Sequence, residues 1–337
     1  MKFHQDKKQS IVLYILEKIE SDSKSVAKVT ADAFEISLNT VHQYLNELIE
    51  NKIIEKTGRG QYALLKKHFS HHFKRSNGDL KSDTYAFDVC LKEHISHLAD
   101  NVRHIWSYAF SEMVNNVMDH SEAENMRVII SQSYLKTSAI IIDDGVGIFE
   151  KIKEHFSLSS LDEAICELFK GKLTTDAQNH SGEGIFFTSK MMDSFLIVSG
   201  EKMFGTSKYE IEGVVETGGK GKGTCVGMSL SNFTNKTAAE IFDLYSNVDG
   251  GFTKTYIPLK NIFDSAPVSR SQAKRVANRL ELFGEIVLDF NGIDWMGQGF
   301  AHQLFVIFKN AHPEIKLIPE NMNESVKNMY NHVTASV

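Results

Sequence analysis

The chain has 337 residues, of which 42% are hydrophobic and 24% charged, and its formal net charge at pH 7 is −6. This length exceeds that of an average domain, so two or three domains are expected. The negative net charge excludes a uniformly basic protein that coats nucleic acid, but not a single small DNA-binding module. The three cysteines are far apart and have no CxxC spacing, which excludes a disulfide framework or a paired-cysteine zinc site.

The first ten residues, MKFHQDKKQS, contain no apolar stretch of the kind found in signal peptides. No apolar run in the chain approaches the length of a membrane-spanning helix, because the longest ones have the length of a strand. A cytoplasmic protein without a membrane partner is therefore expected.

Residues 9–65 have the pattern of three helices followed by a hairpin. Apolar residues recur at helical spacing from Ile11 to Ile19, and a short second helix is expected around 25–34. Polar residues that can cap a helix precede a third helix, expected from about Thr40 to Asn51. Two short strands then flank Gly58-Arg59-Gly60, a hairpin with a basic tip.

This pattern resembles the winged helix-turn-helix of bacterial repressors. The resemblance implies a DNA-binding unit over residues 1–66 that inserts the third helix into a major groove and sets the hairpin against phosphate or the minor groove. The residues implied in DNA binding are Asn39, Thr40, His42, Gln43 and Arg59. Many winged helices instead dock proteins or only dimerise, and that alternative stays open. Paired DNA half-sites would suit a homodimer.

Residues 67–80 are rich in lysine, arginine and histidine. We interpret them as a basic, polar linker exposed to solvent, with contact to phosphate as the alternative role. A metal site built from the histidines is the less favoured hypothesis.

The helix expected around Ser111–His120 carries Glu112, Asn116 and His120 at intervals of four residues. Because an α-helix turns by about 100° per residue, the three side chains share one face. In isolation, such a helix would be an ordinary amphipathic one.

Three further motifs follow in a fixed order. An apolar strand runs into Asp143-Asp144-Gly145-Val146-Gly147, a glycine-containing acidic turn. His180-Ser181-Gly182-Glu183-Gly184 then opens a helix, and Gly221-Lys222-Gly223-Thr224 comes last. Each motif alone is weak, but the four together describe a nucleotide pocket.

In this order the four motifs resemble the N, G1, G2 and G3 boxes of the GHKL superfamily. That superfamily includes gyrase, large heat-shock chaperones, histidine kinases, DNA-repair ATPases and anti-sigma kinases. The resemblance implies an α/β sandwich of the Bergerat type over residues 81–262, with ATP and Mg²⁺ as cofactors. Glu112 then corresponds to the general base, and the amide oxygen of Asn116 is a suitable hard ligand for Mg²⁺. His120 is expected to support the phosphate edge.

The remaining pocket residues follow from the same resemblance. The carboxylate of Asp143 would accept a hydrogen bond from the adenine amino group, with Asp144 as the neighbouring alternative, and Gly145 and Gly147 would allow close approach of the base. Free amides at a helix start would meet the phosphates, and Thr224 would act on the adenine side. Lys172 and Thr174, in a lid over about 149–181, are the expected lid contacts to phosphate, and Gly182 and Gly184 open the helix whose amides would meet the phosphates.

Residues 266–337 alternate helices and strands, which predicts a small α/β layer. We expect helices at about 271–283, 300–310 and 323–333 and strands at 286–290 and 315–318. The segment VLDFNGIDWMGQGF, residues 287–300, resembles the strand–turn–helix of STAS domains. It is still more similar to a STAS-like family of unassigned function found behind GHKL domains, which implies a docking or sensing role toward a protein partner.

Taken together, the patterns predict an α+β, multidomain protein: a winged helix, a GHKL α/β sandwich and a small STAS-like domain. The expected function is that of an ATP-binding and ATP-hydrolysing regulator whose nucleotide state controls DNA binding or partner docking. One alternative is an anti-sigma-like serine/threonine kinase acting on a separate protein, since the turn Met296–Gly299 offers no hydroxyl for self-phosphorylation. A transcription factor that binds ATP without turnover is another. A histidine kinase fits poorly because no phospho-acceptor box occurs.

Overall fold

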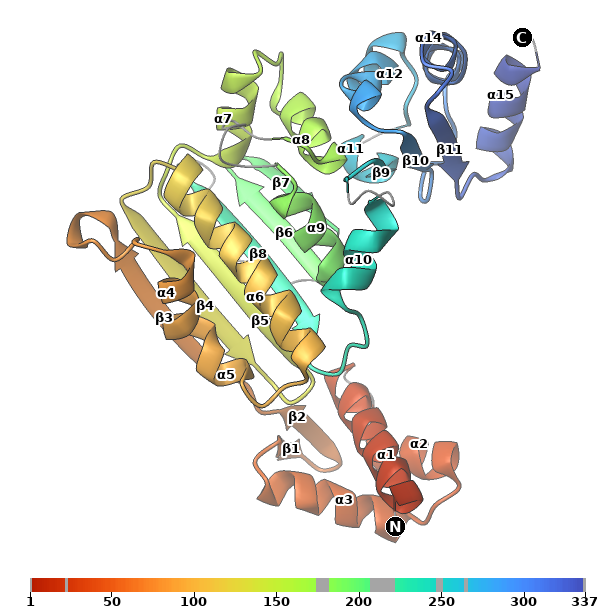
Figure 1. Ribbon diagram of the computed structural model, residues 1–337. Coiled ribbons are helices and arrows are strands. Elements are labelled where there is room, and N and C mark those ends of the chain that lie inside the picture. The colour runs from red at the N-terminus through yellow and green to blue at the C-terminus, as the bar shows by residue number, and fades with distance from the viewer. Residues whose placement is uncertain are drawn as a thin grey trace.

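The structure is a computed structural model that describes residues 2–21, 24–173, 182–206, 222–246, 251–263 and 266–335. Three units follow one another along the chain, and the two ends of the chain lie at opposite ends of the molecule (Figure 1). Within the described residues, no helix is both long and apolar enough to cross a membrane.

The N-terminal unit consists of three helices and a hairpin. The helices are α1 (Lys2–Glu20), α2 (Val26–Phe34) and α3 (Leu38–Glu50), and the antiparallel strands are β1 (Ile54–Gly58) and β2 (Gln61–Leu64). Helix α3 begins two residues earlier than expected because the Ser37 side chain accepts a hydrogen bond from the amide of Thr40 at 3.1 Å. Apolar residues of all three helices form the core of this unit, which includes Ile15, Leu16, Ala31, Val41 and Leu45.

A six-stranded antiparallel sheet forms the centre of the molecule. Its strand order is β3 (Lys67–Lys74), β4 (Asn125–Gln132), β5 (Lys136–Asp143), β8 (Thr224–Ser231), β6 (Ser194–Ser199) and β7 (Lys202–Gly205). Alternate residues of β5 are buried, as expected for a sheet with helices on one face.

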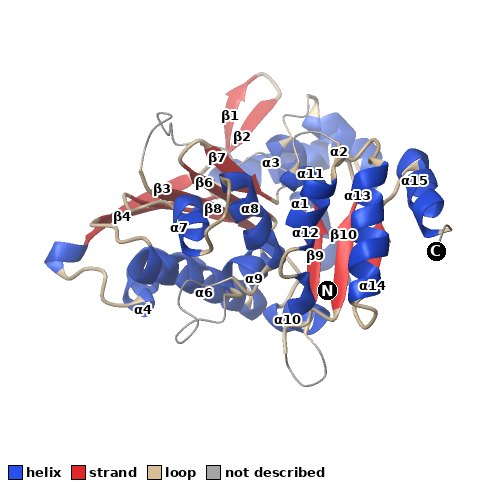
Figure 2. Cartoon of the chain, turned by 90° about the horizontal axis from the view of Figure 1, so that it is seen from above, coloured by secondary structure: helices blue, strands red, loops and turns tan. Residues whose placement is uncertain are grey.

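Helices α4 (Asp83–Phe87), α6 (Asp100–Asn115), α9 (Gly184–Met191) and α10 (Ala238–Tyr245) lie on the same face of this sheet (Figures 1 and 2). A π-helical turn and α5 (Glu93–Ile95) follow α4, and a second π-helical turn, Asn116–His120, continues α6. Helices α7 (Ile148–His155) and α8 (Leu161–Lys170) connect β5 to the region before α9.

The basic linker expected over 67–80 is not a linker, because most of it is the edge strand β3, paired residue by residue with β4. The physical reason is that apolar and polar residues alternate along this segment, which is typical of a strand, although its composition is mostly basic and polar. Phe73 is buried in the core, and the ring of Phe69 stacks on His94 with centroids 3.8 Å apart. Ser70 and His72, which alternate with these residues, are exposed on the face away from the helices.

The C-terminal unit is a three-stranded parallel sheet with the order β11 (Lys316–Glu320), β10 (Glu285–Asp289), β9 (Lys254–Pro258). Its helices are α11 (Leu259–Ile262), α12 (Arg270–Ala277), α13 (Gln298–His302), α14 (Lys309–Ala311) and α15 (Glu324–Thr334), and a π-helical stretch joins α13 to α14.

Two sequence-based boundaries of the C-terminal unit need correction. The boundary at 262 placed β9 in the preceding domain, whereas its residues pair with β10 in register from Lys254–Glu285 to Pro258–Asp289. The helix expected over 271–283 ends at Ala277, because Arg279 adopts a left-handed conformation (φ 59°) and a 3₁₀ turn follows.

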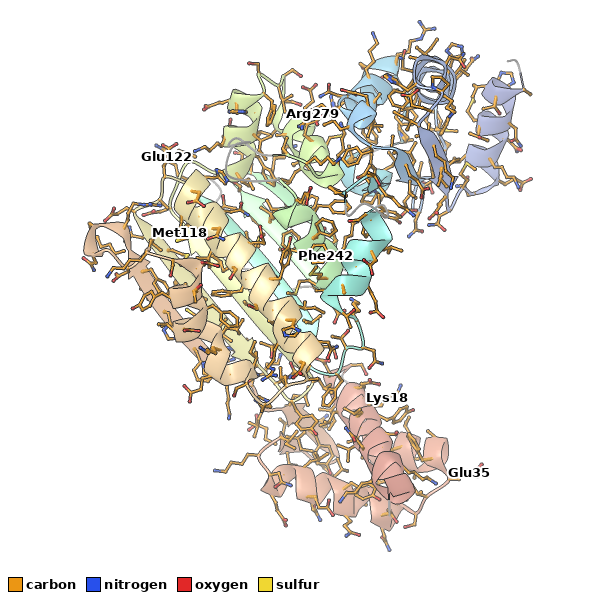
Figure 3. All side chains as sticks on the ribbon, in the orientation of Figure 1. Lys18, Glu35, Met118, Glu122, Phe242 and Arg279 are labelled. Atoms are coloured by element: carbon orange, nitrogen blue, oxygen red, sulfur yellow. The ribbon has the colours of Figure 1, made fainter. Side chains whose placement is uncertain are left out.

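Two hydrophobic cores divide the molecule unequally. The central sheet and the C-terminal unit share one continuous cluster of buried side chains, whereas the N-terminal unit has its own. Figure 3 shows Phe242 on α10 between the helices of the sheet and the C-terminal unit, and Arg279 where that unit meets α8. The ring of Phe242 packs on Phe187 of α9, with centroids 4.6 Å apart.

Candidate functional site

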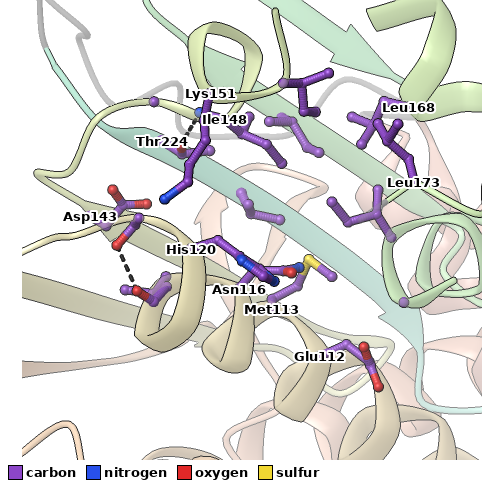
Figure 4. Close-up of a pocket in the computed structure, with 18 of the residues that line it drawn as sticks. Glu112, Met113, Asn116, His120, Asp143, Ile148, Lys151, Leu168, Leu173 and Thr224 are labelled. Atoms are coloured by element: carbon purple, nitrogen blue, oxygen red, sulfur yellow. Dashed lines mark hydrogen bonds between the residues drawn. The ribbon is translucent and has the colours of Figure 1, made fainter. Parts of the chain in front are cut away.

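A cavity of about 260 Å³ opens in the central unit between α6, the turn after β5, and α9 (Figure 4). Segments far apart in the sequence supply its wall. The residues that line it include Glu112, Asn116, His120, Asp143, Gly147, Ile148, Lys151, Leu168, Leu173, Gly182, Gly184 and Thr224.

The three residues spaced by four along the α6 segment all line this cavity. Glu112 belongs to α6, whereas Asn116 and His120 begin and end the π-helical turn that follows it. Figure 4 places Asp143 at one end of the cavity and Glu112 at the other, with Asn116 and His120 between them. The side chains therefore form a polar row along one wall.

Asp143 is the last residue of β5 and is only 7% exposed. Its Oδ1 accepts a hydrogen bond from the amide of Gly145 at 2.8 Å. Burial raises the pKa of this carboxyl to about 6, although hydrogen bonds from the backbone amides of Gly145 and Thr224 act in the opposite direction. A buried carboxyl at a cavity wall is a strong acceptor for a ligand N–H group.

The neighbouring Asp144 has a different role. It accepts hydrogen bonds from the amides of Glu124 at 3.0 Å and Asn125 at 2.9 Å, and from the Asn125 side chain at 2.6 Å. These bonds fix the start of β4 against the turn, and Asp144 is not among the residues that line the cavity. Burial alone would raise its pKa, but the hydrogen bonds outweigh burial and hold the pKa below its ordinary value. Of the two aspartates, Asp143 is the one available to a ligand.

Two glycines are required by the shape of the wall. Gly147 has a φ of 87°, a conformation that L side chains rarely adopt, and an added Cβ would lie 2.7 Å from the Ser199 hydroxyl. A Cβ on Gly184 would collide with the carboxylate of Glu112. Helix α9 therefore approaches Glu112 closely because its first residue has no side chain. Gly145 lies in the same turn, and Gly182 lines the cavity beside Leu173.

Thr224 begins β8 and lines the same end of the cavity as Asp143. Its hydroxyl accepts a hydrogen bond from the amide of Ile148 at 3.0 Å, which joins the start of β8 to the start of α7. The hydroxyl proton is left to point toward a ligand or a water molecule.

One of the expected phosphate ligands, Lys172, contacts the C-terminal unit instead of lining the cavity. Lys172 is not among its lining residues: its Nζ donates to the carbonyl of Leu282 at 3.0 Å and lies 5.0 Å from the centre of the Phe283 ring. Phosphate contact by Lys172 on closure of the lid therefore stays a prediction, and it would require this contact with the C-terminal unit to break. Burial lowers the pKa of Lys172. Thr174 lies outside the described residues.

Lys151 also lines the cavity, although it was not predicted from the sequence. It lies on α7, and its Nζ donates to Glu122 Oε1 at 2.9 Å. Its position one helical turn after Gly147 was the available signal, because helical side chains tilt toward the N-terminus of their helix and α7 begins at the cavity.

The residues expected to bind DNA lie at the surface of the N-terminal unit. On α3, Asn39, His42 and Gln43 are exposed and Thr40 is half-buried. Arg59 is exposed at the tip of the β1–β2 hairpin. The helix and the hairpin are therefore both accessible to a partner.

No cluster of three or more histidine, cysteine, aspartate or glutamate side chains suited to a metal ion occurs among the described residues. A magnesium ion bound with a nucleotide needs fewer protein ligands, because phosphate oxygens and water fill most of its six positions. Asn116 offers one amide oxygen for such an ion in the middle of the cavity wall.

Comparison with known families identifies the C-terminal unit only. Residues 272–327 match the family described as a STAS-like domain of unknown function (DUF4325). The match runs from α12 into α15 and includes β10 and β11, so the molecule is a mixed α/β protein with a C-terminal STAS-like domain. A search of curated proteins found no match.

Proposed function

We propose that this protein is an ATP-binding and ATP-hydrolysing regulator of the GHKL type, with a winged-helix N-terminal unit, in which nucleotide state controls DNA binding or partner docking. One observation carries the proposal. Four separate segments bring Glu112, Asn116, Asp143, Gly184 and Thr224 to one cavity. An accidental motif match gives no reason for these residues to meet.

The order of groups along the cavity suits a nucleotide. Asp143 and Thr224 lie at one end, where a carboxylate and a hydroxyl would meet the adenine amino group and its bound water. Asn116 lies toward the middle, where an amide oxygen would hold Mg²⁺ against the phosphates. Glu112 lies at the far end beside Gly184, where it would orient and deprotonate the attacking water.

The link from nucleotide to regulation is proposed to run through α8. Leu168 of α8 lines the cavity, and the same helix is bonded to the STAS-like domain through Lys170, whose Nζ donates to the carbonyls of Arg275 and Asn278 at 3.1 Å and 2.5 Å. A nucleotide that displaces α8 would therefore move the STAS-like domain with it.

Two variants test the proposal by calorimetric titration of ATP–Mg²⁺ and by phosphate release. Asp143→Asn is expected to abolish ATP binding, whereas Glu112→Ala is expected to bind ATP and lose turnover. Asp144→Asn is the matched control, because Asp144 bonds to the start of β4 and does not line the cavity, and it should keep ATP binding. Turnover at the parent rate in Glu112→Ala would contradict the assignment of Glu112 as the general base. Binding of ATP by Asp143→Asn with the parent's affinity would contradict the assignment of the cavity as the ATP site.

The second candidate function is a serine/threonine kinase of the anti-sigma type. The spacing of Glu112, Asn116 and His120 favours it, and because the turn Met296–Gly299 contains no hydroxyl, the phosphate acceptor would belong to a separate protein. Transfer of label from γ-labelled ATP to a co-purified protein would select this candidate. For DNA binding, a mobility shift with DNA from upstream of the gene should be lost when Gln43→Ala and Arg59→Ala are combined.

A further inference from the structure

Positive charge is concentrated in one short part of a chain that is acidic overall. Residues 51–75 contain seven lysine or arginine residues and one acidic residue, Glu55, which gives a local charge of +6 against −6 for the whole chain. The segment begins before the β1–β2 hairpin and ends just after β3. A local charge of this size is typical of a surface that meets a polyanion.

The structure separates the outward side chains of this segment from the inward ones. On β3, His68, Ser70, His72 and Lys74 are exposed on the side opposite to the buried Phe73. The pairing register sets Arg127 of β4 opposite His72, and the Arg127 Nε donates to the Ser70 hydroxyl at 3.2 Å. Arginine, histidine and hydroxyl groups therefore lie side by side along one edge of the central sheet.

This edge is continuous with the hairpin. Only two residues separate β2 from β3, and Lys66 and Lys67 are both exposed at that junction. The hairpin projects on the strand side of the central sheet, away from α6 and α9 (Figure 2). Since a strand rises about 3.3 Å per residue, β3 adds roughly 25 Å of surface beyond the hairpin, the length of about seven base pairs.

Acidic groups mark where the basic surface ends. The amide of Lys74 donates to Asp79 Oδ2 at 3.0 Å, and the amide of Ser76 donates to Glu124 Oε1 at 3.2 Å. Two carboxylates thus lie at the far end of β3, and the basic surface lies between them and the hairpin. These carboxylates would repel phosphate, so a bound polyanion is expected to lie along the basic part of β3 and not beyond it.

We propose that the β3 strip, defined as Lys66, His68, His72 and Arg127, is a second contact surface for duplex DNA. It would bind backbone phosphates on one side of the groove contacts made by α3 and Arg59. Lysine and arginine supply sequence-independent affinity in this way, while base contacts elsewhere supply specificity. The inference rests on the proposed DNA binding of the N-terminal unit, and it makes DNA a bridge between that unit and the nucleotide-binding sheet.

The test uses the full chain and a fluorescein-labelled duplex of mixed sequence, about 30 base pairs long, in an anisotropy titration at several salt concentrations. The variant combines Lys66→Gln with Arg127→Gln. Its control combines Lys274→Gln with Lys327→Gln, two exposed lysines of the C-terminal unit, so that the net charge changes equally. Circular dichroism verifies that both variants are folded.

Each lost phosphate contact should weaken binding about fivefold near 0.15 M salt and lower the slope of log affinity against log salt by about 0.9. The variant is therefore expected to bind roughly 25-fold more weakly than the parent, with a slope smaller by about 1.8, while the control matches the parent. Equal losses in variant and control would overturn the β3 strip as a specific surface.

Arg59→Ala separates this inference from the proposal on which it rests. If Arg59→Ala weakens binding and the β3 variant does not, the N-terminal unit binds DNA without the strip. The inference about the strip is then wrong, while the proposed DNA binding stands. If the parent does not bind duplex DNA at all, the proposed DNA binding fails and the strip fails with it.

Discussion

The central sheet is joined to its two neighbours in different ways. Toward the C-terminal unit the hydrophobic core is continuous, so the two units share buried side chains. Toward the N-terminal unit the cores are separate, and Leu135 in the β4–β5 turn is the residue of the central sheet that belongs to the N-terminal cluster. An ion pair between Lys136 and Glu20 at 2.8 Å accompanies it, with both side chains about one-third exposed.

The C-terminal junction also contains buried charge. Lys170 Nζ lies 2.7 Å from Glu167 Oε1, and the two side chains are 1% and 3% exposed. The side chain of Asn278 donates to the same carboxylate at 2.8 Å, and the Thr255 hydroxyl donates to the Lys170 carbonyl at 2.7 Å. A buried pair of this kind is tolerated only where further hydrogen bonds satisfy both ions.

Helix α9 makes a second link across the same junction. It begins at Gly184 in the cavity and carries Lys190 near its end, where the Nζ lies 4.6 Å from the centre of the Tyr256 ring. The Tyr256 hydroxyl donates to Asp289 at the end of β10 at 2.5 Å. Burial lowers the pKa of Lys190 to about 8. The C-terminal junction has a shared core and buried charges, whereas the N-terminal junction has separate cores and a partly exposed ion pair. We therefore expect the cavity and the STAS-like domain to move together, and the N-terminal unit to be attached more loosely.

The largest test of this comparison removes the buried carboxylate. Glu167→Ala leaves the Lys170 ammonium buried without its counter-ion, so it should lower the free energy of unfolding by about 3–5 kcal/mol in a denaturant titration. Glu150→Ala is the matched control, because Glu150 pairs with Lys153 at the same spacing on α7 but is half exposed. The control should cost less than about 0.5 kcal/mol. Equal costs for the two variants would show that the buried network does not hold the junction.

The cavity itself gives the second test, through the titration of Asp143. Its pKa of about 6 in the folded chain lies above the ordinary value of 3.8, so the ionised carboxylate destabilises the folded state. The contribution of this carboxyl to stability is complete below pH 3.8 and is lost as the pH rises through 6.

Asp143→Asn removes that titration. Without nucleotide, the variant should be more stable than the parent by about 1–3 kcal/mol above pH 6, and the gain should shrink toward pH 4. Thermal unfolding across pH 4–8 measures it. A gain that does not change with pH would show that another group causes it.

The site residues that the sequence located are those with strict backbone or chemical demands. Gly147 needs a positive φ, and Gly184 leaves space for Glu112, so neither can be replaced without changing the wall. Asp143 is fixed by its place at the end of an apolar strand. Such residues occur in local sequence patterns that can be recognised without knowledge of the rest of the fold, and their meeting at one cavity was expected from the resemblance.

Residues whose surroundings come from distant parts of the chain could not be predicted. Lysines are expected to be exposed, yet Lys170 is buried by partners more than one hundred residues away. Lys172 and Lys151 look equivalent in the sequence, but Lys172 contacts the C-terminal unit while Lys151 lines the cavity. Strand β9 was assigned to the wrong unit because its partner β10 begins some thirty residues later, and local pattern says nothing of which strands pair.

The smallest expected effect lies at the N-terminal junction. Lys136→Ala removes an ion pair that is already partly solvated, so it should change the free energy of unfolding by less than about 1 kcal/mol, and by less still in high salt, which screens such pairs. A denaturant titration at low and high salt measures both values. If Lys136→Ala cost as much as Glu167→Ala, the N-terminal unit would be held as firmly as the STAS-like domain. The proposed effect of bound nucleotide on DNA binding would then have to act through a rigid molecule, and not through reorientation of the N-terminal unit on the sheet.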